Sequence, residues 1–234
     1  MTIVKICGVR RLVDARVAVA AGADIVGFTF WSGTKRYIAP EEAAAVIAAL
    51  RAEGGPLPLF SGLFVNAEPA LIAATVARCG LDLVQLSGDE TAEDVERLAT
   101  PLLMAMRALP GEDVESLRER LHALRHAARS LPPGPLGQPL TPLLDAHVPG
   151  QYGGTGQTGD WLVAAALAAE ERIMLAGGLK PENIADALRV VQPWGVDVAS
   201  GVEVAGQPGV KDAARIGAFI RAARAPVEVS HAAY

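Results

Sequence analysis

The chain has 234 residues, of which 51% are hydrophobic, and a formal net charge of −5, which suits one domain with a sizeable core. No apolar run reaches the ~18 residues of a membrane span and the basic residues are scattered, so we expect neither a membrane nor a nucleic acid as partner. No secretion signal is visible and the two cysteines, Cys7 and Cys79, lie far apart, so we expect reduced thiols in a cytoplasmic protein.

Short apolar runs alternate with alanine-rich stretches along the whole sequence. The apolar runs are continuous, as is typical of parallel strands covered on both faces. The predicted strands are Thr2–Cys7, Ile25–Phe30, Leu57–Val65, Leu81–Leu86, Leu102–Arg107, Thr141–Ala146, Ile173–Ala176 and Gly195–Ala199. The predicted helices, some with proline and acidic residues in the first turn, are Arg11–Ala21, Glu41–Glu53, Glu68–Arg78, Ala92–Ala99, Asp113–Arg129, Asp160–Ala169, Pro181–Val191 and Lys211–Arg224.

This alternation of strands and helices favours an α/β fold of the closed (β/α)8, or TIM, barrel type, with residues 1–234 forming a single domain. An open doubly wound sheet has the same rhythm, but Gly8 is followed by Val9-Arg10-Arg11 and not by a glycine-rich dinucleotide turn. The proline-rich segment Leu131–Pro139 is interpreted as a loop, because no independent fold follows it. We therefore expect a long fifth helix and loop around 109–139, and a short C-terminal tail from about 226.

Barrel enzymes carry their active site at the carboxyl ends of the strands, so the residues that close each strand are the first candidates. The last two predicted strands end in LAGGLKPEN and DVASGVE. The amides of Gly177, Gly178, Ser200 and Gly201 suit a phosphate dianion, and barrels often bind phosphate at these two loops. The alternative is that these glycines only permit tight turns. We favour a phosphate site, and hence a small phosphorylated molecule as the partner.

Asp145 closes the predicted sixth strand, before the glycine-rich segment GQYGGTGQTGDW. Its carboxylate could cap a turn, or it could be a general acid whose pKa is raised by an apolar wall. The glycines that follow indicate a mobile lid or a segment that approaches a ligand closely.

Cys7 closes the first predicted strand and is either an inert buried thiol or a reactive one. Lys5 shares its face of that strand and could favour the thiolate. Arg36 follows the second strand, where it is either a surface charge or a fork that binds a substrate carboxylate. His122 and His126 have a spacing that could serve a metal, but the arginines around them indicate a solvated helix face. We expect no metal site and no cofactor.

Seven segments together resemble the phosphoribosylanthranilate isomerase family. They are KICG, GFTFWSGTKRYI, LFVN, VQLSGDE, LLDAHVPGQYGGTGQTGDW, LAGGLKPENI and GVDVASGVE…PGVKD. The resemblance spans the chain and keeps the family's order of motifs. It implies a (β/α)8 barrel that performs an Amadori rearrangement of N-(5′-phosphoribosyl)anthranilate in tryptophan biosynthesis. We expect a monomer or a homodimer.

The resemblance also implies residue roles. Cys7 inherits the role of general base and Asp145 that of general acid, while Arg36 is expected to hold the anthranilate carboxylate. The phosphate contacts carry over to four residues, with Asp197 nearby; the four are Gly177, Gly178, Ser200 and Gly201.

The sequence departs from the family pattern in three places. Ser87 stands where the family has histidine in QLHG, and Gln157 and Gly159 replace a lysine and an aromatic residue in GKTFDW. The stretch Leu109–Gln138 is longer than expected. Two alternatives stay open: the related barrel that isomerises the histidine-pathway analogue, which has an aspartate in place of Cys7, and a ligand-binding barrel without chemistry.

Overall fold

The computed structural model describes residues 1–107, 112–145 and 161–226. Its strands are β1 (Ile3–Ile6), β2 (Ile25–Thr29), β3 (Leu59–Phe64), β4 (Leu83–Leu86), β5 (Leu102–Arg107), β6 (Leu140–Asp145), β7 (Met174–Leu175) and β8 (Gly195–Val198). Its helices are α1 (Leu12–Ala21), α2 (Pro40–Glu53), α3 (Pro69–Cys79), α4 (Ala92–Glu96), α5 (Val114–Ala127), α6 (Trp161–Ala168), α7 (Ile184–Val191) and α8 (Ala213–Arg224). Short 3₁₀ turns cover Ala128–Ser130 and Ser200–Val202.

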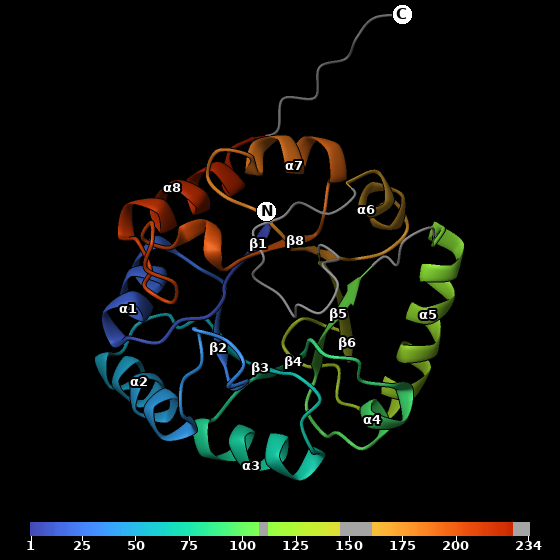
Figure 1. The fold of residues 1–234 in the computed structure, drawn as a ribbon, viewed down its shortest axis with the longest axis horizontal. Coiled ribbons are helices and arrows are strands. Elements are labelled where there is room, and N and C mark those ends of the chain that lie inside the picture. Colours follow the sequence, from blue (N-terminus) through green and yellow to red (C-terminus); the bar gives the residue numbers. More distant parts are fainter. Residues whose placement is uncertain (108–111, 146–160, 227–234) are drawn as a thin grey trace, which may run out of the picture.

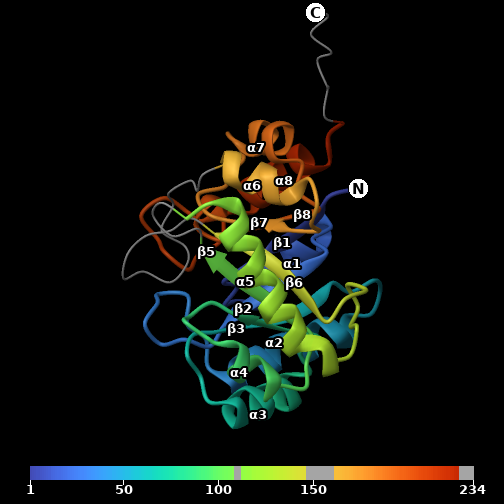
Figure 2. The ribbon, with the colours of Figure 1, turned by 90° about the vertical axis from the view of Figure 1, so that its right-hand side faces the viewer.

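The strands form a closed parallel barrel in chain order, and β1 pairs with β8 to complete it. Figure 1 looks along the barrel and shows the helices as a ring around the strands, while Figure 2 shows α5 running along the outside of the barrel. The predicted (β/α)8 architecture is therefore confirmed. Among the described residues, no helix is long and apolar enough to span a membrane.

Side chains alternate between the two faces of each strand, so the barrel has two separate apolar regions. The larger lies between strands and helices and includes Val4 and Ile6 of β1. The smaller lies inside the barrel, where Ile25, Leu103 and Met174 belong to one cluster. Nearer the carboxyl ends of the strands, the inward positions are occupied by buried polar residues, among them Lys5 and Gln85. The barrel interior is therefore apolar around the Ile25 cluster and polar toward the carboxyl ends of the strands.

Several boundaries differ from the predicted ones. The helix expected over Pro181–Val191 begins at Ile184, because Asn183 Oδ1 accepts a hydrogen bond from the Lys180 amide (2.8 Å) and Asn183 Nδ2 donates one to the Gly178 carbonyl (3.0 Å). These two bonds hold residues 181–183 in a turn. The last helix begins at Ala213, where the Asp212 carboxylate accepts a bond from the Arg215 amide (3.1 Å) and caps the helix.

The fourth helix is shorter than its predicted range and ends at Glu96. The fifth helix has 14 residues and continues into a 3₁₀ turn, after which 131–139 form a loop, as expected. The predicted lid, with Gln157 and Gly159, lies outside the described residues, as does the predicted tail beyond 226.

Candidate active site

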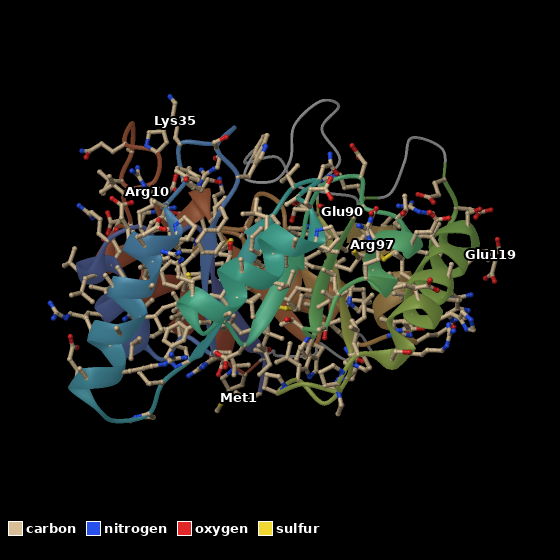
Figure 3. All side chains as sticks on the ribbon, turned by 90° about the horizontal axis from the view of Figure 1, so that it is seen from below. Met1, Arg10, Lys35, Glu90, Arg97 and Glu119 are labelled. Atoms are coloured by element: carbon tan, nitrogen blue, oxygen red, sulfur yellow. The ribbon has the colours of Figure 1, made fainter. Side chains whose placement is uncertain are left out.

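The carboxyl ends of the strands surround a pocket that contains nearly all the predicted site residues. Cys7, Arg36 and Asp145 line its walls, together with Asp197 and the two glycine-containing loops. An adjoining cavity is lined by Gly178, Ser200 and Gly201, so all eight candidates surround one mouth. Figure 3 shows the barrel from the side, with Arg10 and Lys35 at the end that carries the mouth and Met1 at the other.

Cys7 lies just after β1 and is 4% exposed. Burial raises the pKa of its thiol above the ordinary value, although Lys5 acts in the opposite direction through its charge and a hydrogen bond. The prediction that Lys5 favours the thiolate gives the sign of its effect correctly, but not the net result, because burial of Cys7 is the larger effect. Lys5 Nζ also donates a hydrogen bond to Asp197 Oδ1 at 3.0 Å.

Asp145 is the last residue of β6 and is partly buried at the pocket wall. It stands in register with Arg107 at the end of β5. Since β1 and β6 are not neighbours in the barrel, Cys7 and Asp145 approach the pocket from different sides. A ligand in the pocket can therefore contact both groups.

The loops after β7 and β8 are interlocked. Gly177 and Gly178 have φ angles of 83° and 62°, which favour glycine. A Cβ atom on Gly201 would lie 1.9 Å from the Leu179 carbonyl oxygen, so only glycine allows the two loops to approach this closely. Within the described part of the chain, the amides of Gly177, Gly178, Ser200 and Gly201 donate no hydrogen bond. Four available N–H donors in two adjoining loops suit a phosphate.

Arg36 is held by an acidic partner that the sequence did not reveal. Its Nε and Nη2 donate to the two carboxylate oxygens of Glu203 at 2.7 and 2.9 Å, and Lys211 Nζ donates to Glu203 at 3.2 Å and to the Ala199 carbonyl at 2.8 Å. Because Nη1 and the second proton of Nη2 form the other edge of the guanidinium, Arg36 keeps one two-proton edge for a carboxylate.

The absence of a side chain at Gly8 leaves the space in which the Arg36 side chain reaches the mouth. A Cβ atom on Gly8 would lie 2.6 Å from Arg36 Cδ, and Gly8 has a φ of 70°. The glycine of the KICG motif therefore supports both the turn after β1 and the position of the arginine.

Further residues line the pocket, among them Thr29, Trp31 and Gln85. Sequence reasoning places Trp31 and Gln85 near strand ends but assigns them no role, and it does not single out Thr29. Gln85 Nε2 donates to Ser87 Oγ at 3.0 Å, so the departure at Ser87 lies in the pocket and has a partner on its own strand end. Period-two counting back from Ser87 would have placed Gln85 on the inner face of β4.

The histidines of α5 are exposed, as predicted, and His122 Nε2 lies 3.8 Å from Glu171 Oε1. Among the described residues, no group of three or more His, Cys, Asp or Glu side chains could hold a metal ion.

A closed (β/α)8 barrel whose strand ends place a thiol, a carboxylate and backbone amides around one mouth has the arrangement of a barrel enzyme. A family model described as N-(5'phosphoribosyl)anthranilate (PRA) isomerase matches residues 4–222. The isomerase of Geobacter sulfurreducens is 45% identical over 96% of this chain and 99% of its own, and that of Roseiflexus castenholzii is 46% identical over 95% and 98%.

Solved structures agree with these matches. The phosphoribosyl anthranilate isomerase of Thermotoga maritima superposes with a TM-score of 0.77 at 35% identity, covering 95% of this chain and 98% of its own. A phosphoribosyl anthranilate isomerase in complex with reduced 1-(o-carboxyphenylamino)-1-deoxyribulose 5-phosphate has a TM-score of 0.72 at 34% identity, with coverage of 95% and 98%. This chain belongs to the N-(5′-phosphoribosyl)anthranilate isomerase family.

Proposed function

We propose that this chain isomerises N-(5′-phosphoribosyl)anthranilate to 1-(2-carboxyphenylamino)-1-deoxyribulose 5-phosphate in tryptophan biosynthesis, with Cys7 as general base and Asp145 as general acid. Family membership supports the activity, that of an aldose–ketose isomerase. The observation that supports the two roles is that Cys7, Asp145 and the glycine loops line one pocket.

The first step opens the ribose ring. The protonated Asp145 carboxyl donates its proton to the ring oxygen, the bond between that oxygen and C1′ breaks, and the nitrogen lone pair forms a C1′=N double bond. Asp145 is left as a carboxylate and the intermediate carries a positive charge on nitrogen. Proton transfer by a positioned carboxyl group is typically worth a factor of about 10²–10⁴.

The second step removes the C2′ proton. The Cys7 thiolate takes it, the C2′–H electrons form a C1′=C2′ double bond, and the C1′=N electrons return to nitrogen. The resulting enol loses its O2′ proton and gains a proton at C1′, which gives the ketone. The positive nitrogen makes the C2′ proton acidic, so even a small thiolate fraction can remove it.

Two anchors orient the substrate between acid and base. The amides of Gly177, Gly178, Ser200 and Gly201 bind the phosphate, with Asp197 beside them, and the remaining edge of Arg36 binds the anthranilate carboxylate. These contacts hold both anionic ends while the reaction takes place between them. The mechanism uses no cofactor and no metal.

We also propose a cytoplasmic enzyme that is a monomer or a homodimer. The biosynthetic role and the free thiols of Cys7 and Cys79 support this location, and a phosphoribosylanthranilate isomerase of Thermotoga maritima is described as dimeric.

The test supplies purified protein with N-(5′-phosphoribosyl)anthranilate, formed in place from anthranilate, and follows the loss of its fluorescence. The expected result is turnover that stops when the substrate is consumed. Absence of turnover by well-folded protein would contradict the proposed activity. Inorganic phosphate is expected to compete with the substrate, and noncompetitive behaviour would contradict the phosphate site.

A further inference from the structure

Lys5 is the largest side chain with an ionisable group that is fully buried in the barrel interior, at 0% exposure. Lysines are rarely buried to this extent, because removing an ammonium group from water is costly unless it is paired. The apolar cluster inside the barrel would accept an aliphatic side chain at this depth. A lysine here therefore needs an explanation.

Three polar atoms from neighbouring strands converge on Gly27 of β2. A Cβ atom at Gly27 would lie 3.1 Å from Lys5 Nζ, 3.2 Å from Cys7 Sγ and 3.2 Å from Ser61 Oγ. A larger residue at position 27 would push the ammonium and the thiol apart. The glycine thus leaves the space in which Lys5 and Cys7 meet.

On its other side, Lys5 contacts the carboxylate of Asp197. The two residues are directly in register on β1 and β8, and Nζ donates to Oδ1 at 3.0 Å. The ammonium therefore lies between a carboxylate and a sulfur atom. Since Lys5 has three protons to donate, it can serve both groups at once.

We propose that Lys5 is a positioning residue for Cys7: its buried ammonium, fixed by Asp197, holds the sulfur in place and stabilises the negative charge that the sulfur carries when it acts as base. This inference rests on the proposed function, in which Cys7 is the base. It extends that function by assigning a role to Lys5 and a balancing role to Asp197.

The charges around Cys7 give the direction of each effect. Burial raises the pKa of the thiol, Lys5 and Lys211 lower it, and Asp197 raises it. Arg36 and Asp145 line the same pocket. Removing the Lys5 charge should therefore raise the pKa of Cys7, whereas removing the Asp197 charge should lower it. A pair that only ties β1 to β8 would produce no such opposite effects.

The test measures how fast iodoacetamide alkylates Cys7 between pH 7 and pH 9, with mass spectrometry to separate the Cys7 peptide from that of Cys79. In this range the rate follows the thiolate fraction. A pKa increase of one unit lowers that fraction tenfold but raises intrinsic nucleophilicity, so Lys5→Met should slow alkylation by about threefold or more. Lys35→Met, which removes an exposed charge at the same end of the barrel, should leave the rate unchanged.

Asp197→Asn should accelerate alkylation by about threefold or more, since the ammonium is then available to the sulfur alone. It also provides the test if Lys5→Met does not fold. An unchanged rate in folded Lys5→Met, or a slower rate in Asp197→Asn, would overturn the proposal. Because alkylation needs no substrate, this outcome is independent of whether the isomerase reaction is observed. Where the reaction is observed, Lys5→Met should lower kcat more than it raises KM.

Discussion

Two ion-pair systems converge on the same pocket from different depths. Lys5 and Asp197 pair inside the barrel, where the ammonium also meets Cys7. Arg36, Glu203 and Lys211 pair at the rim, in the loops after β2 and β8. The inner pair of Lys5 and Asp197 contacts the proposed base, whereas the rim cluster of Arg36, Glu203 and Lys211 orients the arginine proposed to bind an anionic end of the substrate. The inner pair should therefore affect mainly reactivity and the Arg36–Glu203 pair mainly affinity, while Lys211 also lowers the pKa of Cys7.

The removal of the acid or the base should have the largest effect. Cys7→Ser and Asp145→Asn should each lower kcat by about two orders of magnitude or more, because each deletes a proton-transfer group. KM should change much less, since neither side chain anchors an anionic end. Steady-state fluorescence assays measure both constants. Near-normal kcat in Cys7→Ser would mean that the thiol is structural and that the inner pair supports no base.

Next in size is the effect of Arg36→Met, which removes the charged edge of the rim cluster. A charge-assisted hydrogen bond is worth about 1.5–3 kcal/mol, so KM should rise by about tenfold to a hundredfold. The effect on kcat should be smaller, because the contact is present in ground and transition states alike. The same assay compares the variant with Lys35→Met. Kinetics equal to those of the unmodified protein would identify Arg36 as a surface charge.

Glu203→Gln should have a smaller effect, because it leaves Arg36 in place but removes its charged partner. KM should rise several-fold, within the range of about 0.5–1.5 kcal/mol for one net hydrogen bond, and kcat should stay close to normal. A large fall in kcat with KM unchanged would mean that Glu203 takes part in catalysis, and it would contradict the assignment of the rim cluster to substrate affinity.

The lowered pKa of Glu203 predicts that the stability of the protein depends on pH. Burial acts to raise the pKa of its carboxyl, but Arg36 and Lys211 outweigh burial and hold it below the ordinary value of 4.5. A lowered folded-state pKa stabilises the protein above pH 4.5, and this stabilisation is lost as the pH falls through the folded-state value. Glu203→Gln should therefore lower Tm at pH 7, with a difference that shrinks as the pH falls below 4.5. A constant difference down to low pH would contradict this account.

The smallest expected effect is that of metal removal. Dialysis against a strong chelator should leave activity unchanged, because the mechanism uses only side-chain and backbone groups. A loss of activity that a divalent ion restores would contradict the acid–base mechanism and with it both proposed roles of the ion pairs.

The sequence was sufficient for the barrel and for most of the mouth. Parallel strands in a barrel present their carboxyl ends together, so Cys7, Asp145 and the glycine loops could be assigned to one site from strand order alone. The partners of the charged residues could not be predicted from strand order. Arg36 and Glu203 are 167 residues apart and Lys5 and Asp197 are 192 apart, and only barrel closure brings them together.

The direction in which the pKa of Cys7 is finally shifted could not be predicted from the sequence either. A lysine beside Cys7 is expected to lower the pKa of the thiol. How strongly burial raises that pKa depends on the packing around Cys7, which only the structure shows. Similarly, Asn183 could not be recognised as the residue that delays α7, because its bonds depend on the fold of the Gly178 loop.

The most direct test of separate roles for the inner pair and the rim cluster is to measure kcat and KM for Lys5→Met and Glu203→Gln side by side, with Lys35→Met as the control. We expect Lys5→Met to lower kcat by about threefold or more with little change in KM, and Glu203→Gln to raise KM with little change in kcat. If both variants altered only KM, or both altered only kcat, the inner pair and the rim cluster would not have separate roles, and the account would be contradicted.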